Sequence, residues 1–79
     1  MRLIQPKEYT TGVATKMMLD VAIASDLQSG YIHYALFTED SKKVTEGSLG
    51  IDAEYIAEHY KDYDAAEQKI ADYLGVSII

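Results

Sequence analysis

The sequence predicts an α+β domain: a three-stranded antiparallel meander followed by one or two C-terminal helices packed on one face of the sheet. Between residues 13 and 49, three segments rich in β-branched and aromatic residues are separated by turn residues, which is typical of strands. After Gly50, apolar residues recur at helical spacing. Because every strand precedes the helices, we expect separated β and α parts and not alternating β-α units.

We expect one domain, because 79 residues are too few for two. It divides into an extended segment over residues 1–9, a β-meander over 10–50, and a helical unit with an apolar tail over 51–79. Pro6, the only proline, favours an extended N-terminal segment and is a poor start for a helix.

Residues 12–25 fit two patterns, and we favour a long strand. Five of the six odd-numbered positions from Val13 to Ile23 are apolar, which matches the period of a strand. A helix is the alternative, because good helix formers recur there and helical spacing joins Ala14, Met17, Met18, Val21 and Ser25. That helix would place Leu19 and Ile23 on its solvent side. The sequence does not decide whether residues 13–24 form a strand or a helix.

The next two strands are separated by short polar turns. Residues 26–30 carry turn chemistry: Asp26 can bond the nearby backbone, and Gly30 can adopt a positive φ. Residues 31–38 are dense in aromatic and β-branched side chains and form the clearest strand. A turn over 39–42 leads to a weaker strand over 43–49, in which Gly47 is a candidate bulge. In this order, Val44–Leu49 is an edge of the sheet.

The helical unit begins at Asp52, a good N-cap, with Ile51 and Ile56 at the positions of a hydrophobic staple. Residues 62–64 predict a break, although one bent helix over 52–74 also fits. For a second helix, Asp64 and Glu67 have the spacing of a capping box. An apolar stripe ends before Gly75, which suits a left-handed C-terminal cap. We expect the apolar tail, residues 76–79, to pack on the core as an extra short strand.

The charge distribution narrows the class of partner. The net charge is −6, and residues 50–79 contribute −5 of it, from seven acidic residues and two lysines (2 − 7). Such a chain lacks the basic patch that phosphate contacts require, so we expect no direct nucleic-acid binding. No apolar run reaches the roughly 20 residues of a membrane span, and the first residues lack the apolar run of a signal peptide. We therefore expect a soluble cytoplasmic protein.

The reactive side chains show no catalytic or metal-binding pattern. There is no cysteine. His33 shares its predicted strand face with side chains that are not ligands, and His59 has only Asp62 near it, whereas zinc takes three or four protein ligands. The serines lack a nucleophile motif, and residues 62–67 lack the glycine of a calcium loop. We predict no catalytic residue, no metal, no cofactor and no concavity in which reactive groups could meet.

The remaining functional clue is an unusual set of seven tyrosines with no tryptophan. Several of them lie among the acidic residues of the helical unit, and tyrosine is enriched at binding surfaces. Two interpretations remain open: the rings pad a small core, or they form a contact surface with the carboxylates. In the second case the partner-binding residues are Glu54, Tyr55, Glu58, Asp62, Tyr63, Asp64 and Asp72.

Four features follow one another along the chain: residues 32–36 (IHYAL), Glu46-Gly47, Tyr55, and a C-terminal stretch from Ile70 to Ile78 that contains a leucine-glycine motif. In this order they resemble a class of small uncharacterised proteins encoded by tailed bacteriophages and prophages. The likeness runs from about Ala14 onward. The chain departs from the class in having no tryptophan in the acidic segment. The resemblance implies a phage origin and an accessory or assembly role, in the host cytoplasm or the virion, and it supplies no catalytic residues.

These observations lead us to expect a non-catalytic protein–protein interaction or assembly module that binds itself or a larger protein. The alternative is an acidic inhibitor that imitates nucleic acid and blocks a basic host protein, with Asp52 added to the carboxylates named above. An enzyme is the least favoured class. It would need an active site assembled between subunits from His59, Asp62 and tyrosines.

Overall fold

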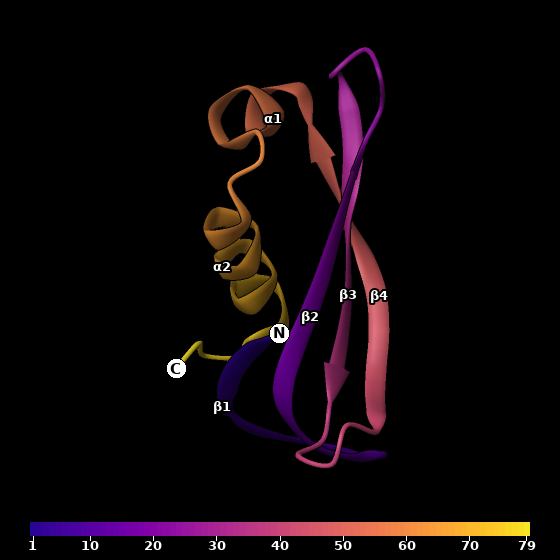
Figure 1. The fold of residues 1–79 in the computed structure, drawn as a ribbon, viewed down its shortest axis with the longest axis vertical. Helices are drawn as coiled ribbons and strands as arrows, with labels where there is room; N and C mark the ends of the chain where they lie inside the picture. Colours follow the sequence, from indigo (N-terminus) through magenta and orange to yellow (C-terminus); the bar gives the residue numbers. More distant parts are fainter.

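A computed structural model describes residues 1–79. It contains four strands, β1 (Arg2–Tyr9), β2 (Gly12–Ile23), β3 (Ser29–Phe37) and β4 (Lys43–Asp52), and two helices, α1 (Ala53–His59) and α2 (Tyr63–Leu74). The strands form one sheet in the order β1-β2-β3-β4, with every neighbouring pair antiparallel. Both helices follow the sheet in sequence and lie on the same side of it (Figure 1). The predicted α+β class, a meander followed by helices, is confirmed.

The predicted extended N-terminal segment forms β1 and gives the sheet a fourth strand. It pairs with β2, and the register shifts between Leu3 and Lys7, around Pro6. Proline has no N–H to donate to a ladder, so it is tolerated at an edge strand or an irregularity. The C-terminal tail lies against the same strand: the Gln5 N–H donates to the Ser77 carbonyl at 2.8 Å, and Ile4 forms a bridge with Ile78. The tail packs on the core as expected, but it forms a single bridge to β1 and not a short strand.

Residues 12–23 are extended, so the strand interpretation of this segment is confirmed. Alternation holds from Met17 onward, whereas at the start of β2 Ala14 is buried and Val13 is exposed. Met17 is fully buried, and Leu19, Val21 and Ile23 pack against the core from the same side of the strand. Met18 lies on the opposite side and is exposed. A helix would have split these residues between two faces.

Two predictions about glycines are wrong. Gly30 does not supply the positive φ of the β2–β3 turn; Leu27 does, at 61°. Gly30 lies instead inside the β2–β3 ladder, opposite Ile23. Gly47 is not at a bulge, because it pairs regularly with Tyr34, and the irregularity between β3 and β4 lies beyond Leu36. In the β2–β3 turn, the Asp26 side chain does accept a hydrogen bond from the Gln28 N–H, at 3.0 Å.

There are two helices and not one bent helix, and their caps define the break. Asp52 caps α1 as predicted, since its carboxylate accepts from the Tyr55 N–H at 2.9 Å. The predicted cap of the second helix is wrong by two residues: Asp62, not Asp64, accepts from the Ala65 N–H, at 3.0 Å. Lys61 has a φ of 61°, which turns the chain before Asp62. Gly75 ends α2 in the left-handed conformation (φ 71°), as predicted.

The position of the α2 cap gives a direct test. We expect Asp62→Ala to lower the free energy of unfolding by about 1 kcal/mol, because it removes the acceptor for an N-terminal N–H of α2. Asp64→Ala, two residues away, removes only a charge from the first turn and should cost a few tenths of a kcal/mol. Urea unfolding of the two variants measures the difference. A larger loss for Asp64→Ala would place the cap at the residue predicted from the sequence.

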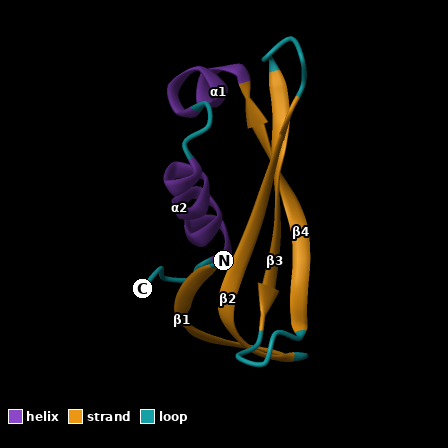
Figure 2. Cartoon of the chain, in the orientation of Figure 1, coloured by secondary structure: helices purple, strands orange, loops and turns teal.

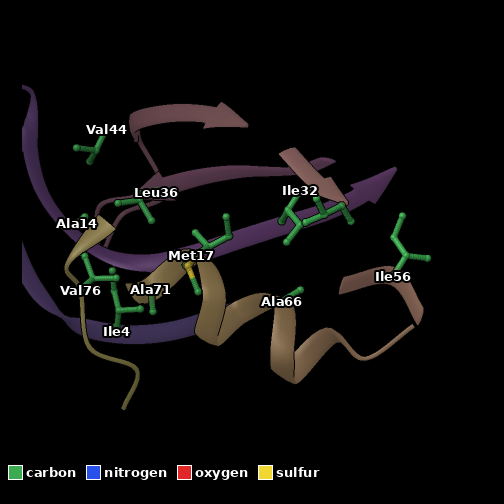
Figure 3. Close-up of a cluster of buried hydrophobic side chains, with 12 residues drawn as sticks. Ile4, Ala14, Met17, Ile32, Leu36, Val44, Ile56, Ala66, Ala71 and Val76 are labelled. Carbon is green, nitrogen blue, oxygen red and sulfur yellow. The ribbon is translucent and has the colours of Figure 1, made fainter. Parts of the chain in front are cut away.

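The fold has two layers, and only one face of the sheet is covered. Figure 2 shows both helices on one side, with no helix or loop crossing the opposite side. Between the layers lies a core of twelve buried residues, all of them apolar. Figure 3 shows this core, to which β1, β2 and β3 contribute Ile4, Met17 and Leu36, and α2 contributes Ala66 and Ala71. Neither helix has the length and apolar character needed to cross a membrane.

Candidate interaction surfaces

The outer edge of β4 presents unpaired backbone groups, and the ladder identifies which ones. The Ala24 N–H donates to the Ser29 carbonyl at 2.9 Å, in register with the β2–β3 ladder, so odd-numbered residues of β3 bond to β2. In an antiparallel sheet, hydrogen-bonded pairs alternate along each strand. Even-numbered residues of β3 therefore bond to β4, where their partners carry odd numbers. The N–H and C=O groups of the even-numbered residues, Glu46, Ser48 and Gly50, point away from the sheet.

This free edge has a defined start and end. At the start, the Thr11 hydroxyl from the β1–β2 turn donates to the Val44 carbonyl at 2.6 Å, so the Val44 carbonyl is not available to a further strand. At the end, Asp52 caps α1 and the chain leaves the sheet. The strand that the sequence placed at the edge, Val44–Leu49, lies within β4 at the end of the strand order. We call the stretch Glu46–Gly50 the β4 edge.

A pocket lies where α1, α2 and the ends of β2 and β4 meet. It has a volume of about 200 Å³ and is lined mainly by apolar side chains, with His59, Lys61 and Asp62 among its polar residues. The prediction of no concavity in which reactive groups could meet is wrong, because His59 and Asp62 both line this pocket. The pocket arises because the turn at Lys61 holds the two helices at an angle over Val21 and Ile23, which a single continuous helix would not do (Figure 1).

The polar groups of this pocket are loosely arranged. His59 Nδ1 lies 3.8 Å from Asp62 Oδ2, and His59 Nε2 lies 3.7 Å from Glu58 Oε2. Both distances exceed the range of a hydrogen bond. The other oxygen of Asp62 caps α2. No three histidine, cysteine or carboxylate side chains gather at one point to form a metal-binding group. The geometry can hold a small apolar group, and it does not align an acid–base pair.

Tyr55 borders the same pocket and carries a buried hydroxyl with no hydrogen-bond partner in the protein. Its ring packs 5.0 Å from the His59 ring, and Lys69 Nζ lies 4.9 Å from its centroid. Burial, and then the negative charge of Asp62, raise the pKa of the Tyr55 hydroxyl. The tyrosine rings were expected either to pad the core or to form a contact surface with the carboxylates. Tyr55 pads the core, since its ring packs against the core cluster.

We expect Tyr55→Phe to leave the free energy of unfolding unchanged or raise it by up to about 1 kcal/mol, because it removes a buried hydroxyl without a partner. Tyr63→Phe, at an exposed ring, should have no effect.

Because the pKa of Tyr55 is raised in the folded protein, its hydroxyl ionises at a lower pH in the unfolded chain than in the folded one. The free energy of unfolding should therefore fall as the pH rises above about 10, and it should fall less steeply in Tyr55→Phe. Urea unfolding at neutral and alkaline pH measures both effects. A destabilised Tyr55→Phe at neutral pH would contradict the unpartnered hydroxyl.

The predicted partner-binding residues do not form a single site. Tyr55, Asp62 and Tyr63 meet at the pocket. The other four, Glu54, Glu58, Asp64 and Asp72, are exposed and do not line it. Glu54 and Glu58 are one helical turn apart on α1, whereas Asp64 and Asp72 share a face of α2 with Gln68, which donates to Asp72 at 2.8 Å.

Two other acidic side chains of the helical unit have structural partners. Asp52 caps α1, and Glu67 lies 3.6 Å from Arg2. The acidic residues are therefore divided among capping, pairing and solvent-facing positions.

Comparison with protein-family models, with curated proteins and with solved structures gave no match.

Proposed function

We propose that this protein is a non-catalytic interaction and assembly module that binds another protein chain through its β4 edge. The observation that carries the proposal is the row of outward-facing backbone groups at Glu46, Ser48 and Gly50. Such a row is a template for pairing with a further strand. The resemblance to small phage proteins supports an assembly role, in the host cytoplasm or the virion.

The shape of the edge favours strand addition. Ser48 carries a small side chain and Gly50 none, and the larger side chains opposite them, His33 and Tyr31, belong to β3 on the side away from the free edge. An added Cβ at Gly50 would meet nothing within 4 Å. No other segment of the chain pairs with this edge, because β1 and the tail complete the opposite end of the sheet. A partner strand can therefore approach without displacing part of the fold.

Nucleic-acid mimicry by the acidic helices is the alternative. It needs a continuous row of free carboxylates, and the structure instead uses Asp52 and Asp62 as caps and places Glu67 against Arg2. What remains is four exposed carboxylates divided between two helices. Binding through them would be strongly salt-dependent.

A site-specific crosslinking experiment tests the proposal. A photo-reactive amino acid is placed at Glu46 on the β4 edge, at Glu58 on α1, or at Ser25 in the β2–β3 turn as a control, in the organism that encodes the protein. We expect a protein adduct from position 46 and none from position 25. The adduct from position 46 should disappear when the same chain carries Ser48→Pro, which removes an outward N–H. Absence of any adduct at position 46 overturns the proposal, and adducts confined to position 58 that are lost at high salt favour mimicry.

A further inference from the structure

We propose that the partner of the β4 edge is the β4 edge of a second copy, paired antiparallel about a two-fold axis at Ser48. This inference rests on the proposed function and names its partner. The pairing would join two four-stranded sheets into one continuous sheet, with Ser48 opposite Ser48 and Glu46 opposite Gly50 of the second copy. The outward groups of three residues in each copy provide about six backbone hydrogen bonds.

The boundaries of the free edge fix this register. Glu46, Ser48 and Gly50 lie between two even-numbered residues whose carbonyls have other roles: Val44 accepts from Thr11, and Asp52 is the N-cap of α1, whose carbonyl accepts the first intrahelical bond. Ser48 is their midpoint. Sliding one copy in one direction places Glu46 opposite Asp52, two carboxylates in direct opposition, which is unfavourable. Sliding it in the other direction requires the Val44 carbonyl, which already accepts from Thr11.

The charges along β4 favour the same antiparallel pairing. The strand begins beside Lys42 and Lys43 and ends beside Asp52 and Glu54, and all four side chains are exposed. In an antiparallel pair, the basic start of one copy lies beside the acidic end of the other, and the two-fold axis creates this match twice. A parallel pair would bring like charges together at both ends. Glu46, the acidic residue within the β4 edge, faces a glycine in the proposed register and keeps its own partner in the same strand, since Lys43 Nζ lies 3.0 Å from Glu46 Oε2.

The primary test is the oligomeric state of the full chain and of two variants at Ser48. We expect sedimentation equilibrium to show a reversible monomer–dimer equilibrium in the wild type. Ser48→Pro removes an outward N–H that the monomer does not use, so it should weaken dimerisation about tenfold or more while the circular dichroism spectrum is kept. Ser48→Ala keeps the N–H and should dimerise within about twofold of the wild type.

A charge swap provides an independent test that does not depend on the proline variant folding. Lys42 lies opposite Glu54 in the proposed register and has no ion pair in the monomer, whereas Lys43 pairs with Glu46. Lys42→Glu and Glu54→Lys each place like charges together and should each weaken the dimer several-fold. The double variant restores opposite charges and should recover most of the wild-type affinity. The wild-type dimer should weaken as salt rises, because these charges are exposed.

Each outcome separates this inference from the proposed function. A wild type that is monomeric up to about 1 mM overturns self-pairing, as does a dimer that Ser48→Pro leaves unchanged. If position 46 nevertheless crosslinks to a different protein, the β4 edge is an interaction site with a different partner, and the proposed function stands. If position 46 gives neither a self-adduct nor another adduct, both proposals fail.

Discussion

Gly30→Ala should lower the free energy of unfolding by about 3 kcal/mol, because a Cβ at this position has no space. A Cβ built there would lie 2.4 Å from the Ala22 carbonyl oxygen and 3.0 Å from the Ile23 Cα. Both atoms belong to the backbone of β2, so no side-chain rotation relieves the contact. The β2–β3 ladder has to open at the end where Gly30 pairs with Ile23. This ladder joins the two central strands of the sheet, β2 and β3. The substitution should therefore lower the midpoint of a single cooperative unfolding transition.

The same substitution at Gly50 is the matched control. Gly50 also lies in a strand, opposite Tyr31 in the β3–β4 ladder, and an added Cβ meets no atom within 4 Å. Gly50→Ala should be neutral or stabilise the protein by about 0.5–1 kcal/mol, since alanine restricts the unfolded chain more than glycine does. Urea unfolding of both variants gives the comparison. Equal effects at the two positions would show that glycine flexibility, and not the close approach of β2, determines the outcome at Gly30.

Local sequence signals were sufficient wherever a feature depends on neighbouring residues. The alternation from Val13 to Ile23 predicted β2, and the N-cap Asp52 and the C-terminal Gly75 predicted one end of each helix. Each of these features is decided within a few residues, by side-chain period or by a capping hydrogen bond. The class of fold follows from them, because amphipathic helices after a meander can cover only its apolar face.

Features that depend on distant contacts were missed or misplaced. Pro6 predicts that residues 1–9 are extended. Whether this segment becomes a strand of the sheet depends on its pairing with β2 and with Ile78 of the tail, which is far away in sequence. The start of α2 is misplaced for a local reason, because Asp64 and Glu67 have the spacing of a capping box although Asp62 is the residue that caps the helix. The left-handed turn at Lys61 makes Asp62 the cap, and no sequence pattern marks that turn.

The candidate surfaces divide in the same way. The order of strands identified β4 as an edge, since the last strand of a meander has only one neighbour. Which of its backbone groups face outward depends on the register with β3, and register is a property of the folded sheet. The pocket beside His59 depends on the angle between α1 and α2, which no local sequence pattern gives, and the sequence therefore predicts no concavity in which reactive groups could meet.

Ile70→Ala should cost about 2–5 kcal/mol, the largest loss expected for a single side-chain truncation in this chain. Ile70 is fully buried on α2 and belongs to the cluster that joins the helices to the sheet. Truncation removes buried methyl groups and leaves a cavity that a two-layer fold cannot easily close. A domain of this size is held by roughly 4–12 kcal/mol, so the variant should be partly unfolded at moderate urea concentrations.

Ile79→Ala is the matched control for Ile70→Ala, because it makes the same truncation at a side chain that is 66% exposed. The backbone bond of Ile79 to the Leu3 carbonyl is retained, so we expect a loss below about 0.5 kcal/mol. If Ile70→Ala does not fold, Ile70→Val should still fold and lose about 0.5–1.5 kcal/mol. A loss at Ile70 no larger than the loss at Ile79 would mean that α2 does not cover the sheet. The β4 edge would still be free in that case, because it follows from the strand order, but the inner face of the sheet beside it would be exposed as well.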